Sequence, residues 1–124
     1  MPQIYAIIGP DYVNKIIPEL KILDRAFSKA IVDVLGEEVK EDVVFTAVSA
    51  VYTRGEADLQ IEIRLTTGRD EYNTGHIFNP TQEDWKNISE RFANIARKLP
   101  IRSFSVWPKP YREAEFMLFE FGKS

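Results

Sequence analysis

The stretch Met1-Pro2-Gln3-Ile4-Tyr5-Ala6-Ile7-Ile8 places a proline directly after the initiator methionine and then an apolar, β-prone run. This composition predicts a strand that begins at Pro2. If the methionine is removed, Pro2 becomes a free secondary amine, and an unperturbed α-amino group titrates at about 7.7–8.0. Burial would lower that pKa, because burial disfavours the charged form. Pro2 is therefore a candidate general base; alternatively, it merely begins a strand at a position where no ladder donor is lost.

The composition is that of one soluble domain over residues 1–124. Of these residues, 44% are hydrophobic and 28% are charged, which is enough to build a core. The formal net charge of −3 gives no basic field for nucleic acid. There is no cysteine, which excludes disulfides and thiolate catalysis and fits a cytoplasmic location. No apolar run reaches transmembrane length, so we expect no membrane partner.

Two segments have the periodicity of amphipathic helices. The first has apolar residues at three- and four-residue spacing and ends at Gly36; its apolar residues are Leu20, Leu23, Phe27, Ala30, Ile31 and Val34. The second follows Thr81, a good helix cap; its apolar residues are Trp85, Ile88, Phe92, Ile95 and Leu99. We expect both apolar stripes to pack against a sheet.

The remaining apolar segments predict strands. Residues 59–66 alternate between apolar and polar, whereas residues 43–52 are largely apolar on both faces, so a second subunit is expected to cover one of those faces. Residues 101–107 form the next expected strand, the prolines of 108–110 predict a turn, and 114–121 form a final apolar strand. The order predicts an α+β sandwich with two helices on one face of the sheet.

The polar segment 67–80 is long enough to suggest a functional loop. It contains His76, the single histidine, which we interpret as a solvated loop residue rather than a general base. A metal site formed with Asp70 and Glu71 has no recognisable zinc spacing, and the separated glycines form no phosphate-binding fingerprint. We therefore expect no cofactor.

This layout resembles the tautomerase superfamily, which includes 4-oxalocrotonate tautomerase, 5-carboxymethyl-2-hydroxymuconate isomerase and macrophage migration inhibitory factor. The resemblance covers nearly the whole chain as two strand-helix-strand units, with a strand beginning at Pro2. It implies a mixed sheet built from two β-α-β units, with a C-terminal strand in addition. It also implies a homotrimer whose sheets face inward.

The resemblance implies that Pro2 is the catalytic base, which moves a proton within an enol or dienol acid. Thr67 and Arg69 are similar in position to residues that line the proline pocket in that family. Trp107 resembles the aromatic wall that a neighbouring subunit supplies; the alternative, which we favour, is packing in the core or at an interface. Arg64 and Arg112 are further substrate-binding candidates; the alternative for Arg69 and Arg112 is a surface ion pair.

The chain departs from the bacterial tautomerases where they carry carboxylate-binding arginines. Gly9-Pro10-Asp11 and Val43-Val44-Phe45 occupy those regions. The acid group of a substrate must then meet other cations, for which the candidates are Arg54, Arg64, Arg69, Lys109 and Arg112. Two alternatives to an isomerase remain open, a non-catalytic assembly or binding protein with the same fold and a ferredoxin-like binding domain.

Overall fold

The computed structural model describes residues 2–41, 43–50, 58–67 and 80–112. The elements follow in the order β1 (Gln3–Ile8), α1 (Val13–Ile16), η1 (Ile17–Glu19), α2 (Leu20–Leu35), η2 (Glu37–Val39), β2 (Val44–Ser49), β3 (Leu59–Thr67), α3 (Gln82–Ala96) and β4 (Phe104–Arg112). No helix within these ranges is long and apolar enough to cross a membrane.

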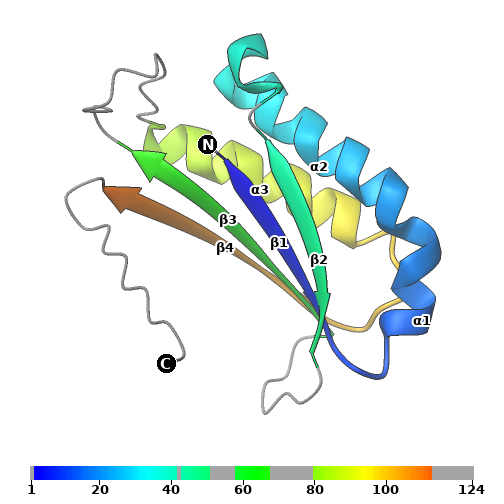
Figure 1. Ribbon diagram of the computed structural model, residues 1–124. Coiled ribbons are helices and arrows are strands. Elements are labelled where there is room, and N and C mark those ends of the chain that lie inside the picture. The colour runs from blue at the N-terminus through cyan, green and yellow to red at the C-terminus, as the bar shows by residue number, and fades with distance from the viewer. Residues whose placement is uncertain (1, 42, 51–57, 68–79, 113–124) are drawn as a thin grey trace, which may run out of the picture.

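The strands form one mixed sheet in the order β2-β1-β3-β4. β1 pairs in parallel with β2, β3 pairs in parallel with β4, and the two central strands, β1 and β3, pair antiparallel. Each parallel pair is connected through a helix, so the sheet consists of two β-α-β units joined at the β1–β3 ladder. Helices α2 and α3 lie on the same face of the sheet (Figure 1), which confirms the predicted α+β architecture.

The core lies between the helices and the central strands. Alternate residues of β1 and β3 are buried on the helix side; they are Ile4, Ala6, Ile8, Leu59, Ile61 and Ile63. Phe27 of α2 stacks on Phe92 of α3 with ring centroids 4.4 Å apart and an interplanar angle of 20°. Both rings belong to the predicted apolar stripes, which are confirmed as the core faces of the helices.

Local signals in the sequence determine where the helices begin and end. Thr81 accepts a hydrogen bond from the Asp84 backbone N–H at 3.1 Å, and the Asp84 carboxylate accepts one from the Thr81 N–H at 2.9 Å. This capping box satisfies two N–H groups that the first turn leaves without partners. At the end of α2, Gly36 has a φ of 107°, a region that side chains with a Cβ rarely adopt.

The predicted turn at residues 108–110 is wrong, because β4 continues through both prolines to Arg112. A proline can lie within an edge strand when its missing N–H would point away from the ladder. β4 is an outer strand of the described sheet, so both prolines are accommodated. The strand expected at 114–121 lies outside the described residues.

The ferredoxin-like alternative is also wrong. That fold is a split β-α-β arrangement, in which the two strands of a unit are not neighbours. Here the two strands of each unit are direct neighbours, with Gln3 opposite Val44 and Leu59 opposite Phe104.

Replacing Thr81 by alanine should lower the free energy of unfolding by about 1 kcal/mol, because the Asp84 N–H loses its acceptor. Urea denaturation followed by circular dichroism would measure the change. Gln82→Ala, one residue into the same helix and exposed, is the matched control and should have little effect. Equal losses in the two variants would contradict the capping role.

Candidate functional site

Pro2 is buried directly before the central strand β1. Its carbonyl accepts a hydrogen bond from the Val44 N–H at 3.0 Å, so the ladder to β2 already includes this residue. Because side chains alternate between the two faces of a strand, Pro2 lies on the same face as Ile4 and Ala6, which is the face that the helices cover. Burial at this point is the environment that the sequence analysis required for an amine of lowered pKa.

The other candidates at this end of the sheet come from β3 and β4. β1 begins where β3 and β4 end, because β1 runs antiparallel to both. Thr67 and Arg112 are the last residues of their strands and lie opposite each other in the register. Their backbones thus reach the sheet end at which Pro2 lies. Arg69 lies outside the described residues.

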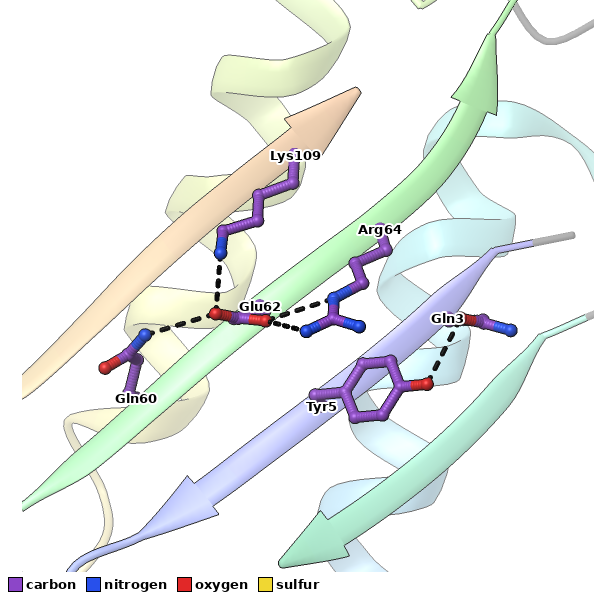
Figure 2. A network of polar contacts seen from close by, with 6 residues as sticks. All are labelled: Gln3, Tyr5, Gln60, Glu62, Arg64 and Lys109. Atoms are coloured by element: carbon purple, nitrogen blue, oxygen red, sulfur yellow. Dashed lines mark hydrogen bonds and ion pairs between the residues drawn. The ribbon is translucent and has the colours of Figure 1, made fainter. Parts of the chain in front are cut away.

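A polar cluster occupies the face of the sheet opposite the helices, which we call the open face. Glu62 is only 5% exposed. Its carboxylate accepts hydrogen bonds from Lys109 Nζ at 2.7 Å, from Arg64 Nη2 at 2.7 Å and Nε at 3.1 Å, and from Gln60 Nε2 at 3.3 Å. Figure 2 shows these side chains converging on Glu62 from β3 and β4.

The cluster extends to β1 through an aromatic contact. The Arg64 guanidinium lies 4.3 Å from the centre of the Tyr5 ring, and the Tyr5 hydroxyl donates to Gln3 Oε1 at 3.2 Å. In the β1–β3 register, Tyr5 lies opposite Glu62 and Gln3 lies opposite Arg64. The network therefore connects three adjacent strands (Figure 2).

The electrostatics of the cluster are governed by competition at Glu62. Burial acts to raise the pKa of the Glu62 carboxyl, but hydrogen bonds and charge from Lys109 and Arg64 together outweigh it and hold the pKa below its ordinary value. The carboxylate is ionised at neutral pH. Two cations, Lys109 and Arg64, pair with the single carboxylate of Glu62.

Exposed apolar side chains flank the cluster. Trp107 is 52% exposed and lies opposite Glu62 in the β3–β4 register, while its Nε1 donates to Ser105 Oγ at 2.9 Å. At the opposite edge of the same face, Val44 and Val48 of β2 are 41% and 39% exposed. The open face thus combines paired charges with apolar surface that no described element covers.

A second buried carboxylate, Asp58, lies at the opposite end of the sheet. It accepts a hydrogen bond from the Arg102 N–H at 2.9 Å, and the Arg102 side chain approaches it to 3.5 Å. Burial opposes the charge, yet the Arg102 backbone and side chain hold the pKa of Asp58 below its ordinary value. The Asp58 carbonyl also accepts from the Gly9 N–H at 2.8 Å, so this cluster fixes the corner between β1 and β3.

The structure brings some predicted residues together and separates others. Pro2, Thr67 and Arg112 belong to one end of the sheet. Arg64 and Trp107 lie on the open face, whereas Pro2 lies on the face that the helices cover. Sequence analysis missed Glu62 as the centre of a charge cluster. Within the described ranges, no group of three or more histidine, aspartate or glutamate residues is placed to hold a metal ion.

No family model and no curated protein matches the sequence. Solved structures do match its fold. A wild-type fused 4-OT, solved as a symmetric trimer, aligns with a TM-score of 0.65 at 15% identity over 94% of this chain and 90% of its own. A 5-carboxymethyl-2-hydroxymuconate delta-isomerase aligns with a TM-score of 0.60 at 15% identity over 98% and 89% of the two chains.

A macrophage migration inhibitory factor-like protein from Entamoeba histolytica gives a TM-score of 0.59 at 13% identity, over 95% of each chain. These likenesses extend over nearly the full length of every chain compared. The chain therefore has the tautomerase fold, and the resemblance inferred from its layout is confirmed at the level of fold.

Glu62→Gln should lower the free energy of unfolding by about 1–3 kcal/mol at pH 7, because Lys109 and Arg64 lose a charged acceptor. The folded-state pKa of Glu62 lies below its ordinary value of 4.5, so the carboxylate stabilises the fold fully above pH 4.5. That stabilisation is lost as the pH falls through the folded-state pKa. The difference between variant and wild type in urea titrations should therefore shrink below pH 4.5.

Asp33→Asn is the matched control, because Asp33 is an exposed carboxylate of α2 that also pairs with two cations, Lys29 at 2.7 Å and Arg91 of α3 at 3.3 Å. Exposed pairs contribute little, so this variant should lose much less stability. A Glu62→Gln loss that is no larger than the control, or that does not change with pH, would contradict the account.

Proposed function

We propose that the chain is a tautomerase-type isomerase in which Pro2, freed by removal of Met1, is the general base. The observation that supports this role is the burial of Pro2 directly before the central strand of a tautomerase fold. A buried amine has a lowered pKa, and a base is most effective when its pKa lies near the working pH. The proposed substrate is a small enol or dienol acid.

The proposed chemistry is a proton shift. The Pro2 nitrogen takes the proton of an enol hydroxyl, the electron pair moves through the double bond, and the protonated Pro2 delivers the proton to carbon, which gives the keto form and restores the free amine. No electrons are transferred to an external acceptor, so the reaction itself requires no redox cofactor. The rigid ring of proline holds the nitrogen lone pair in a fixed direction relative to β1.

Substrate contacts are proposed from two sources. Thr67 and Arg112 end their strands at the sheet end where Pro2 lies, and Arg69 follows Thr67 closely in the sequence. We propose that these three residues bind the acid group from the same subunit as Pro2. Arg64 and Trp107 stand on the open face, and we propose that they reach a pocket of a neighbouring subunit. The guanidinium of Arg64 would bind a substrate carboxylate there.

The proposed assembly is a homotrimer in which the open faces turn inward. Its support is the uncovered apolar surface of Val44, Val48 and Trp107 together with a charge cluster whose members are already hydrogen-bonded to one another. Burying such a cluster costs less than burying isolated charges, because each charge retains its partner. The matching fused 4-OT was itself solved as a trimer.

A non-catalytic assembly or binding protein with the same fold is the second candidate. The observation that favours it is the engagement of Arg64 and Lys109 by Glu62, which leaves a substrate carboxylate to compete for both cations. In that case the open face serves assembly, and Pro2 only begins β1.

Pro2→Ala should lower kcat for ketonisation of phenylenolpyruvate by about 10²–10⁴-fold, the usual contribution of a general base. The variant should remain folded, and the enol absorbance provides the assay. Pro10→Ala, an exposed proline in the following turn, is the matched control and should retain activity. Equal activity of the wild type and Pro2→Ala, with Met1 shown to be absent from both, would favour the non-catalytic candidate.

Val48→Asp should dissociate the proposed trimer, because it introduces a charge without a partner into the apolar part of the open face. Sedimentation velocity should show a shift from about three chains to one, since a buried unpaired charge is strongly unfavourable. Ile22→Asp is the control, because Ile22 is 62% exposed on α2, away from the open face. A trimer that survives Val48→Asp would contradict the proposed interface.

A further inference from the structure

The strand registers arrange the open face as three rows that each cross all four strands. Side chains alternate between the two faces of a strand, so every second residue of a strand belongs to this face. Within these rows Glu62 is the only acid, and Arg64 and Lys109 are the only bases. From the Pro2 end of the sheet, the rows consist of Val44, Gln3, Arg64 and Lys109, then Thr46, Tyr5, Glu62 and Trp107, then Val48, Ile7, Gln60 and Ser105.

The two cations of this face depend on Glu62 to different degrees. Among the described residues, Glu62 is the only hydrogen-bond or ion-pair partner of Lys109. Arg64 has a further contact, because its guanidinium also lies 4.3 Å from the centre of the Tyr5 ring. Glu62 itself accepts hydrogen bonds from Gln60, Arg64 and Lys109 (Figure 2). Glu62 would therefore keep partners without Lys109, whereas Lys109 would keep no described acid without Glu62.

Lys109 lies at the rim of the open face on a restrained backbone. Pro108 and Pro110 flank it within β4, and a residue that precedes a proline is restricted to extended conformations. The Lys109 side chain is 36% exposed, whereas that of Glu62 is 6% exposed. Lys109 is two residues from Trp107 on the same face, and Trp107 is exposed. A surface that covers Trp107 would therefore also remove water from the ammonium group of Lys109.

Removal of that water makes the charge of Glu62 decisive. A buried cation that keeps its carboxylate partner is tolerated, but one that loses it is strongly unfavourable. Replacing both members of a buried pair by neutral groups is much less harmful than removing one of them. The pair of Glu62 and Lys109 therefore makes the open face compatible with burial in a way that neither charge alone would.

We propose that the ion pair of Glu62 and Lys109 is the feature that lets the open faces of three copies of this chain close on one another. The inference rests on the homotrimer proposed above and assigns its assembly to one carboxylate. Three copies would bring three Lys109 side chains into the same interface, each neutralised by the Glu62 of its own chain. Val44, Val48 and Trp107 would supply the apolar area around them.

The test compares the wild type with Glu62→Gln, Lys109→Gln and the double variant that carries both changes. Sedimentation equilibrium over a dilution series gives the concentration at which half of the chains are trimeric. Far-UV circular dichroism of each sample establishes that the chain is folded. Asp33→Asn is the matched control, because Asp33 pairs with Lys29 at the same 2.7 Å, but on α2, across the sheet from the open face (Figure 1).

We expect Glu62→Gln to raise the half-trimer concentration about tenfold or more, because glutamine keeps the shape of the side chain and removes its charge. Lys109→Gln and the double variant should both stay within about threefold of the wild type, since neither contains the unpaired ammonium group. Asp33→Asn should leave the value unchanged. The second substitution should thus restore the assembly that the first one weakens.

Two results would overturn the inference and leave the proposed trimer intact. One is a Glu62→Gln trimer as stable as that of the wild type, and the other is a folded double variant that assembles no better than Glu62→Gln. A wild-type chain that forms no trimer would overturn the proposed assembly and this inference together. If Glu62→Gln alone does not fold, the double variant decides, because a folded monomer would contradict the inference and a trimer would support it.

Discussion

The antiparallel ladder between β1 and β3 is the interaction on which the rest of the structure depends. It joins two β-α-β units that would otherwise each expose an apolar sheet edge. Because both units contribute a central strand, their helices cover one continuous face, where Phe27 and Phe92 stack. The same ladder brings the start of β1 to the ends of β3 and β4, so Pro2 becomes part of a sheet end rather than a loose terminus.

The ladder also determines what the other face can do. It aligns Tyr5 with Glu62, and the parallel β3–β4 pairing aligns Glu62 with Trp107. Lys109 and Arg64 both pair with Glu62, so the buried carboxylate on this face keeps its hydrogen-bond partners.

Sequence patterns predicted the parts of the fold that depend on local periodicity. The stripe from Leu20 to Val34, the Thr81 cap and the alternation of residues 59–66 each reflect the geometry of a single element. The Glu62 cluster could not be found that way, because Lys109 lies 47 positions away and meets Glu62 only through the β3–β4 register. A strand register must be known before such a pair can be recognised.

The prolines of β4 show the same limit. Pro108 and Pro110 read as a turn in the sequence, since the effect of proline on a strand depends on which side its nitrogen faces. Only the sheet order makes β4 an edge. Of the candidate site residues, Pro2 was identified from its position in the chain, while the separation of Arg64 from the Pro2 face required the pleat of paired strands.

The central claim is that Pro2 is a reactive amine in an organised environment, and the most direct measurement is its alkylation by 3-bromopyruvate as a function of pH. Intact mass would establish removal of Met1, and fragmentation would locate the adduct. The account predicts a single adduct on Pro2 with an apparent pKa below the range of about 7.7–8.0 for an ordinary amino terminus. A free Pro2 that reacts no faster than in the unfolded chain would contradict it.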